Sequence, residues 1–388
     1  MHSQISEGDD TPALRALFSD RSWPEASLTS SSALRGKTVL VSGAGGSLGR
    51  TLMQALVREP VRRIVAMDAS EHVLVQLQSQ VGDAAPVQYV LGDLRRPADR
   101  RRALRTEPDI VIHAAAYKHV PFLEERPIAA VENNLLATVD WEQACRKAGV
   151  ERFLFVSTDK AVASTSVMGR TKYWGERWFR WCQTRTPAET SAHLDHTTVR
   201  LCNLFGSRGS VVPRFVRHLR AGEPLPLTHP DMHRWFMTSS DASETLLCAL
   251  GAPPGTYVPT ACFYVSIVTL AHRLVRWGRP GADPDEWIRW VGRRPGERLH
   301  ETLWDEEETV ERGDDEALRR VNGTSPTTAL SERVEALRSA CAADDVEAVR
   351  RLLRPEEETE GASEGASPSE ASAQWQKRAE PQYGPDDR

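Results

Sequence analysis

Between Lys37 and about residue 204, short apolar runs alternate with longer amphipathic stretches, and this alternation leaves few folds open to the chain. Four of the six apolar runs are rich in valine and isoleucine, as is typical of strands covered on both faces. Repeated strand–helix units at this spacing predict a parallel, doubly wound α/β sheet. Right-handed crossovers then bring the carboxyl ends of the strands to one edge, where ligands bind.

The apolar runs and the helical patterns can be assigned to definite ranges. The predicted strands are Thr38–Ser42, Arg63–Met67, Val87–Leu91, Asp109–His113, Phe153–Ser157 and Thr197–Leu201. The predicted helices are Ser47–Arg58, Glu71–Gln80, Ala98–Arg105, Ile128–Ala148 and Val167–Gln183. Shorter elements are expected around 213–222, 241–251 and 266–278, and a helical pair over 331–353.

A glycine-rich turn follows the first predicted strand and opens the next predicted helix. It reads Gly43-Ala44-Gly45-Gly46-Ser47-Leu48-Gly49. In this position glycines permit a tight turn and a close approach of the backbone to a pyrophosphate, and the start of the helix supplies free N–H groups. A Rossmann-like dinucleotide site is therefore expected here.

The ends of the next three strands extend this expected site. The second strand ends at Asp68, 25 residues after Gly43, where a carboxylate accepts hydrogen bonds from ribose hydroxyls and repels a 2′-phosphate. No arginine follows in Ala69-Ser70, so the expected cofactor is NAD rather than NADP. The third strand ends in Gly92-Asp93-Leu94, which suits an adenine edge. The fourth ends in His113-Ala114-Ala115-Ala116, where small residues admit a flat ring and His113 is expected to be a core histidine.

Residues 157–172 contain two of the chain's six lysines, although lysine and arginine together number 49. Thr158, Asp159 and Lys160 follow an apolar run, and Lys172 stands in the next predicted helix. Arginine stays protonated in proteins, whereas a desolvated or crowded lysine can lose its proton. This pattern indicates an amine that must be able to become neutral; the alternative is a chance cluster of surface lysines.

Composition and charge exclude several classes of protein. The net charge is -5 and no basic stripe is present, so neither a nucleic acid nor a membrane surface is an expected partner. The first residues carry no leader pattern and no apolar run approaches the roughly 18 residues that span a bilayer, so a cytoplasmic protein is expected. The scattered cysteines are expected to be reduced and mostly buried, and no metal site is expected, because neither they nor the histidines show ligand spacing.

An ordered series of motifs resembles one known family, the extended short-chain dehydrogenases/reductases of the polysaccharide-biosynthesis branch, and within it the UDP-N-acetylglucosamine 4,6-dehydratases. The resemblance covers roughly residues 36–353, without the membrane-spanning N-terminal region of many members, and so implies a stand-alone soluble form. The motifs are GAGGSLG (43–49), DASE (68–71), GDL (92–94), HAAAYKHVPFLEERP (113–127), NNLLAT (133–138), STDKAV…MGRTK (157–172), RLCNLFGSRGSVVPRF (200–215), THPDMHRWFMT (228–238) and GRRPGERLHE (292–301).

The resemblance implies a role for each matching residue. Thr158 would be the hydroxyl residue of the catalytic set, Asp159 the acid at the sugar C6 hydroxyl and Lys160 the base at C5, while Lys172 would hold the nicotinamide ribose. The expected cofactor contacts are Gly43, Gly45, Gly46, Ser47, Leu48, Gly49, Asp68, Ser70, Asp93, Leu94, Ala114, Ala115, Ala116 and Lys172. The expected UDP-sugar contacts are Lys118, Asn203, Ser210, Val211, Val212, Arg234, Arg294 and Glu297.

One departure from the family pattern keeps alternatives open. Met168 stands where the usual tyrosine would be, and a thioether cannot deprotonate an alcohol. Some dehydratases of this branch also carry methionine there, and Asp159, or Thr158 through a water, would then be the base at the C4 hydroxyl. The expected activity is a 4,6-dehydratase acting on a UDP-hexose, UDP-N-acetylglucosamine first. A UDP-sugar 4-epimerase is the nearest alternative, although it needs no C5 base and C6 acid together, and a non-catalytic NAD- or nucleotide-sugar-binding protein is the second.

The composition divides the chain into five expected parts. Gly, Pro and Arg increase after residue 204, which indicates a smaller lobe over the sheet edge, and the chain from 355 has too few apolar residues to order itself. Trp174, Trp178 and Trp181 share a helix face that is core or subunit interface, and the family resemblance favours a homo-oligomer, a dimer or higher. The expected parts are a polar N-terminal extension (1–35), an NAD-binding Rossmann domain (36–203), a mainly substrate-binding lobe (204–330, with 236–251 packing on the Rossmann domain), C-terminal helices (331–354) and a disordered acidic tail (355–388).

Overall fold

The structure, a computed structural model, describes residues 16–18, 32–82, 86–185, 193–312, 316–323 and 329–355. Most of the expected N-terminal extension lies outside the described residues, and so does the expected acidic tail after Pro355. No helix in the described ranges combines the length and the apolar composition that crossing a membrane requires.

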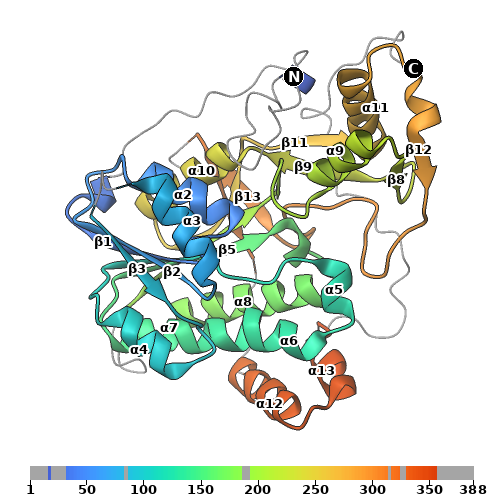
Figure 1. Ribbon diagram of the computed structural model, residues 1–388. Coiled ribbons are helices and arrows are strands. Elements are labelled where there is room, and N and C mark those ends of the chain that lie inside the picture. The colour runs from blue at the N-terminus through green and yellow to red at the C-terminus, as the bar shows by residue number, and fades with distance from the viewer. Residues whose placement is uncertain are drawn as a thin grey trace.

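A nine-stranded sheet forms the centre of the molecule and confirms the expected α/β class (Figure 1). All six predicted strands are present, and their ends differ from the predicted ones by at most two residues. Strand β10 extends the parallel sheet beside β6, and β14 and β13 then add to it in antiparallel fashion. In spatial order the strands are β13 (Thr309–Arg312), β14 (Leu318–Asn322), β10 (Gly255–Pro259), β6 (Asp195–Leu201), β5 (Arg152–Thr158), β4 (Ile110–His113), β1 (Thr38–Ser42), β2 (Arg63–Asp68) and β3 (Val87–Leu91).

Helices cover both faces of this sheet because successive strand residues point to opposite sides. Leu40 of β1 belongs to one core, and Val39 and Val41 belong to another. Figure 1 shows the helices of the first core below the sheet and those of the second above it. The upper layer contains η1 (Ser32–Leu34), α2 (Ser47–Leu56), α3 (Glu71–Val81) and α10 (Ser239–Gly251). The lower layer contains α4 (Pro97–Leu104), α5 (Val120–Glu124), α6 (Pro127–Val131), α7 (Ala137–Lys147) and α8 (Val167–Thr184).

The helix predicted over 128–148 contains an irregular turn that the sequence pattern did not predict. Between α6 and α7, residues Glu132–Leu136 form a π-helical turn, η2. The turn presents the fully buried Asn134, whose amide accepts a hydrogen bond from the Tyr117 backbone N–H (2.8 Å) and donates to the Tyr117 carbonyl (2.9 Å). Such turns are frequent at functional sites, and this one holds the loop that follows β4.

The C-terminal helices α12 (Leu330–Ala342) and α13 (Val346–Leu353) cover α6 and α8 from below (Figure 1). The indole N–H of Trp174 donates to the Leu353 carbonyl (2.9 Å), and the Arg333 guanidinium lies 4.4 Å from the centre of the same indole. Trp174 and Trp178 are buried within the chain itself. These tryptophans therefore belong to the core, and the expected homo-oligomer remains a prediction that they do not support.

A smaller lobe stands at one end of the sheet (Figure 1). It contains two small sheets, β11–β9–β7 and β12–β8, with helices packed around a third core. Its elements are β7 (Asn203–Leu204), α9 (Val211–Ala221), β8 (Leu225–Leu227), β9 (His233–Met237), β11 (Phe263–Ser266), α11 (Ile267–Gly278), η4 (Pro284–Trp287) and β12 (Ile288–Trp290).

Two residues of the expected N-terminal extension belong to the core of this lobe. Leu17 and Phe18 are buried, and the Phe18 ring lies 5.5 Å from that of Phe263. The Arg273 guanidinium lies 4.6 Å from the centre of the Phe18 ring and donates to the Leu17 carbonyl (2.9 Å). The chain before the sheet is therefore anchored to the lobe.

The Phe18→Ala variant is expected to lower the free energy of unfolding by about 3 kcal/mol, because it leaves a cavity in the lobe core. Chemical denaturation followed by fluorescence would measure this loss. The matched control is Phe122→Ala, since the Phe122 side chain is 55% exposed and its removal leaves no cavity. Equal denaturation midpoints for the two variants would contradict the anchoring role of Phe18.

One pair of cysteines departs from the expectation that all are reduced. Cys202, directly after β6, and Cys262, directly before β11, form a disulfide. Sequence spacing could not indicate this pair, because strand pairing within the lobe brings together two residues that lie 60 positions apart. Cys145, Cys182 and Cys341 are free thiols and are buried.

Candidate active site

A crevice opens at the carboxyl ends of β1, β2, β3 and β4, where the expected cofactor site lies. Most of the expected cofactor contacts in the described chain line it, while Gly45, Ser47, Leu48, Gly49, Ser70 and Lys172 are not on its wall. The lining residues are Ser42, Gly43, Gly46, Met67, Asp68, Ala69, Gly92, Asp93, Leu94, His113, Ala114, Ala115, Ala116, Tyr117 and Asn133.

The glycine-rich turn approaches its neighbours more closely than any side chain would allow. Gly43 has a φ of +79°, and a Cβ there would lie 2.7 Å from the backbone nitrogen of Ala115. A Cβ on Gly49 would lie 2.2 Å from the Gly43 carbonyl oxygen. The two glycines thus let the turn pack closely against the end of β4 and against the start of α2, a geometry that suits a bound diphosphate.

Asp68 ends β2 beside this turn and is held by two backbone groups. One carboxylate oxygen accepts from the Gly45 N–H (3.1 Å) and the other from the Ser70 N–H (3.0 Å). On the next strand end, the Asp93 carboxylate accepts from the Arg95 guanidinium (2.6 Å), a hydrogen bond that lowers the pKa of Asp93. Asp93 therefore remains anionic at neutral pH on the crevice wall.

His113 is a structural residue of the crevice floor, as expected. Its Nδ1 lies 2.8 Å from the Ser42 hydroxyl and its Nε2 lies 2.8 Å from the Thr138 hydroxyl. Complete burial, together with the nearby Lys172, lowers the pKa of His113 to about 3. The imidazole is therefore neutral and holds β1 and α7 against the end of β4.

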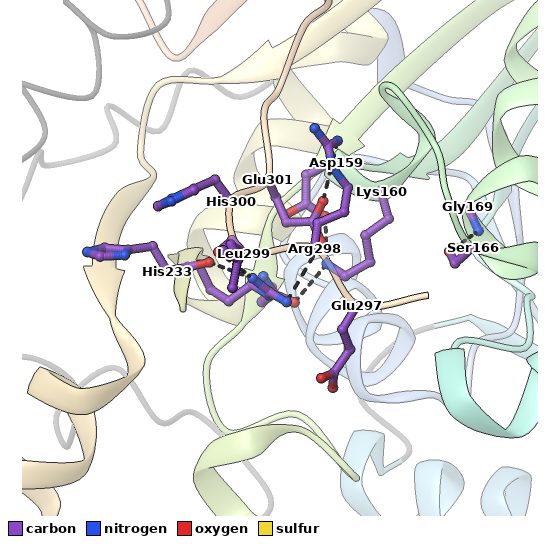
Figure 2. Close-up of polar contacts among 12 residues, drawn as sticks. Asp159, Lys160, Ser166, Gly169, His233, Glu297, Arg298, Leu299, His300 and Glu301 are labelled. Carbon is purple, nitrogen blue, oxygen red and sulfur yellow. Dashed lines mark hydrogen bonds and ion pairs between the residues drawn. The ribbon is translucent and has the colours of Figure 1, made fainter. Parts of the chain in front are cut away.

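Thr158, Asp159 and Lys160 form a hydrogen-bonded group at the end of β5, which Figure 2 shows in part. One carboxylate oxygen of Asp159 accepts from the Lys160 amine (2.7 Å) and from the Thr158 hydroxyl (2.9 Å). The Lys160 amine also donates to the Asn203 side-chain oxygen (3.0 Å). Asn203 is in turn fixed, because its amide N–H donates to the Trp235 carbonyl (2.8 Å) in the lobe.

Helix α8 supports this group from below. Its first turn is capped by the Ser166 hydroxyl, which accepts from the Gly169 N–H (3.0 Å; Figure 2). A Cβ on Gly169 would lie 2.2 Å from the Lys160 carbonyl oxygen, so only glycine lets the helix approach the Thr158–Lys160 segment this closely. The preceding residue of the helix, Met168, is buried in the lower core and offers no proton-transfer group.

Lys172 lies on the same helix behind the group. Its amine donates to the Val156 carbonyl (2.9 Å) and lies 4.4 Å from the centre of the Phe155 ring. Burial lowers the pKa of Lys172 to about 7, and the nearby Glu176 opposes this shift. The amine is therefore close to half-protonated near neutral pH, a state open to lysine but not to arginine.

The expected substrate residues are only partly brought together. Arg234 donates to the Leu299 carbonyl (3.1 Å) and lies 3.9 Å from the Glu301 carboxylate. The Glu297 carboxylate accepts from the Arg294 N–H (3.1 Å), and in Figure 2 it points away from Asp159 and Lys160. Ser210 precedes α9, which begins with Val211 and Val212, and the Val212 side chain is closed off in the lobe core. The surrounding protein and the nearby Arg208 lower the pKa of Lys118, although its side chain remains open to solvent.

Residues 298–301 also border the site, although the sequence predicts no role for them. Arg298 donates to the Val162 carbonyl (3.1 Å) and so holds residues 298–301 against the segment that follows Lys160. The Glu301 carbonyl accepts from the Trp235 indole (2.9 Å), and the Glu301 side chain is buried beside Asp159 and Lys160 (Figure 2). The motif GRRPGERLHE contains both residues, but nothing in its spacing indicated which side chain turns inward.

Comparison with known proteins finds one family and several similar chains. The family model described as polysaccharide biosynthesis protein matches residues 39–322. The capsular polysaccharide biosynthesis protein CapD of Staphylococcus aureus is 33% identical over 282 residues, which are 71% of this chain but only 46% of CapD. The inverting UDP-N-acetylglucosamine 4,6-dehydratase of Campylobacter jejuni is 29% identical over 273 residues (69% of this chain, 77% of that protein). The UDP-glucose 4-epimerase of Rickettsia conorii is 28% identical over 285 residues (72% and 80%).

Solved structures share the fold. Pen from Bacillus thuringiensis superposes with a TM-score of 0.67 at 25% identity, over 76% of this chain and 90% of that one. DesIV, the dTDP-glucose 4,6-dehydratase of Streptomyces venezuelae solved with NAD bound, superposes with a TM-score of 0.61 at 21% identity, over 79% and 98%. At such identities the likeness to DesIV concerns the fold alone.

Proposed function

The chain belongs to the polysaccharide biosynthesis protein family, and from that premise we propose that it is a nucleotide-sugar 4,6-dehydratase. The proposed substrate is a UDP-hexose, UDP-N-acetylglucosamine first, and the product is its 4-keto-6-deoxy derivative. One observation carries the proposal: the amine of Lys160 and the buried carboxyl group of Asp159 lie together at the end of β5. A base and an acid side by side are what an elimination across two neighbouring carbon atoms needs.

The proposed cofactor is NAD, and the crevice fits it in two respects. Its glycine turn presents bare backbone to the crevice at Gly43 and Gly46, and Asp68 is an oriented carboxylate where ribose hydroxyls would bind. When bound, NAD would accept the hydride from C4 of the sugar and return it to C6. The relatives support a nucleotide-sugar enzyme but do not choose between dehydration and epimerisation.

The residues at the end of β5 would move the protons of this reaction. Asp159, or Thr158 through a water, would accept the C4 hydroxyl proton, because Met168 cannot. With a ketone at C4 the C5 proton becomes acidic, and Lys160 would remove it as a neutral amine. Asp159 would give its proton to the departing C6 hydroxyl, which leaves as water, and C5 would finally be reprotonated.

The Asp68→Ala variant is expected to bind NAD about tenfold more weakly, because the ribose hydroxyls lose a charged acceptor. Its preference for NAD over NADP is expected to narrow, since the charge that repels a 2′-phosphate is removed. Isothermal titration with both nucleotides would measure each affinity. Glu347→Ala removes an exposed carboxylate of α13 and serves as the control; unchanged NAD affinity in Asp68→Ala would contradict the assignment.

The proposed reaction is tested by mass spectrometry after the protein is incubated with UDP-N-acetylglucosamine in H₂O and in D₂O. Loss of one water with gain of one deuterium supports elimination through C5. An isomer of unchanged mass would support a 4-epimerase, for which no C5 base is needed. Inertness toward this and other UDP- and dTDP-hexoses would favour a non-catalytic binding protein, the reading that Met168 favours.

A further inference from the structure

Glu301 is a buried acidic residue that the proposed reaction leaves without a role. Its side chain is only 5% exposed, and among the described residues its Oε2 atom has no hydrogen-bond partner. The nearest cationic groups are the Arg234 and Arg298 guanidiniums, each 3.9 Å from a carboxylate oxygen of Glu301. These distances exceed those of a hydrogen bond, so neither arginine satisfies the carboxyl group.

Asp159, beside Glu301, likewise has a buried carboxylate oxygen without a hydrogen-bond partner among the described residues. Its Oδ1 atom holds both the Lys160 amine and the Thr158 hydroxyl, while Oδ2 is buried and lacks a partner within the described chain. Figure 2 shows Asp159, Lys160 and Glu301 gathered at one point. Two unsatisfied carboxyl oxygens in one buried site are unfavourable, because each has lost its hydrogen bonds to water without gaining a partner in the protein.

We propose that Glu301 is a positioning residue that stays protonated at neutral pH and donates its O–H to the free oxygen of Asp159. This inference rests on the proposed dehydratase function and deepens it. A single proton on Glu301 supplies the donor that the unsatisfied Asp159 oxygen requires. With Glu301 neutral, the site also avoids two adjacent negative charges.

The charged groups around Glu301 act in opposite directions. Burial raises the pKa of Glu301, and the adjacent Asp159 raises it further. Lys160 on the catalytic loop, Arg234 on β9 and Arg298 on the same segment lower it, and burial outweighs them. A protonated carboxyl group is thus compatible with every charged group that faces it.

The protonation of Glu301 decides whether Lys160 can act as a base. With Glu301 neutral, Asp159 is the carboxylate that pairs with the Lys160 amine. Once Asp159 accepts the C4 hydroxyl proton, its negative charge no longer pairs with the Lys160 amine, and the amine can release its proton to water and act as the base. An ionised Glu301 would keep Lys160 protonated, so the elimination should be lost as pH rises through the pKa of Glu301.

The Glu301→Gln variant tests this role, because the amide keeps a donor and cannot ionise. It should keep the rate at neutral pH within about threefold of the unmodified protein and should extend activity to higher pH. Glu301→Ala should lose about tenfold or more, since Asp159 again lacks a donor. Glu306→Gln makes the same chemical change at an exposed position and should alter neither the rate nor the pH profile.

Two outcomes would overturn the inference. One is a folded Glu301→Gln protein that is inactive at every pH, which would mean that Glu301 must ionise. The other is a Glu301→Gln protein whose activity falls at the same alkaline pH as that of the unmodified protein.

A second measurement does not depend on turnover. The infrared spectrum of the unmodified protein at neutral pH should contain a protonated-carboxyl band that is absent from Glu301→Gln and present in Glu306→Gln. A carboxylate band in its place would refute the protonated state, even if no substrate is ever converted. If the band is present but no sugar reacts, the proposed function fails while the protonation of Glu301 stands.

Discussion

Replacing Lys160 with methionine is expected to lower the rate of water loss from UDP-N-acetylglucosamine by about 10³-fold or more. Methionine has a similar length but no group that can accept the C5 proton. NAD binding should change little, because the Lys160 amine bonds to Asp159 and Asn203 and is not part of the crevice wall. Mass spectrometry of the sugar and titration with NAD would measure the two effects separately.

The matched control for this change is Lys147→Met, which removes an exposed amine from the end of α7. Its rate should equal that of the unmodified protein. Full activity in Lys160→Met would refute the assignment of the C5 base. A loss of activity accompanied by a lowered denaturation midpoint would instead indicate a structural role for the ion pair with Asp159.

Replacing Lys172 with methionine is expected to remove a pH-dependent component of stability of about 4 kcal/mol between pH 7 and pH 10. The pKa of Lys172 is lowered to about 7 in the folded protein from the ordinary value of 10.5, because the amine is buried. Between these pH values the unfolded chain binds a proton that the folded chain does not. The free energy of unfolding of the unmodified protein therefore rises with pH across this window, and the cost of burying the amine is fully present below it.

Denaturant titrations at pH 7 and pH 10, without nucleotide, would measure this difference. Other groups titrate in the same range, but the unmodified protein and the variant share them. The difference between the two proteins in how the free energy of unfolding changes with pH is therefore due to Lys172. Lys147→Met should retain the slope of the unmodified protein. If the free energy of unfolding changed equally with pH in Lys172→Met and in the unmodified protein, the buried amine would titrate at its ordinary pKa.

The strands and the cofactor crevice could be predicted from the sequence because local patterns determine them. Valine- and isoleucine-rich runs such as Ile64–Met67 form buried parallel strands whatever follows them. The glycine turn at 43–49 indicates a dinucleotide site only when a strand precedes it and a helix follows it, and the structure has both, β1 and α2. Asp159 and Lys160 could be singled out because lysine is rare in this chain.

The remaining features depend on contacts between distant segments, which local patterns do not record. Strand β10 joins the sheet beside β6, although the sequence around it reads as part of the lobe. Phe18 belongs to a short apolar run in an otherwise polar stretch, and nothing in that run indicates that Phe263 and Arg273 surround its ring. Glu301 looks like one acidic residue among many in the sequence, and only the fold turns it toward Asp159.

The position of these segments along the chain determines the order in which the parts of the site are synthesised. The residues that line the crevice all lie between Ser42 and Asn133, whereas the proposed proton-transfer site also includes Asp159, Asn203 and Glu301. During synthesis, the whole lining of the crevice leaves the ribosome more than 150 residues before Glu301 does. On the proposed function, a fragment that ends before Glu301 is therefore expected to bind the nucleotide without converting the sugar.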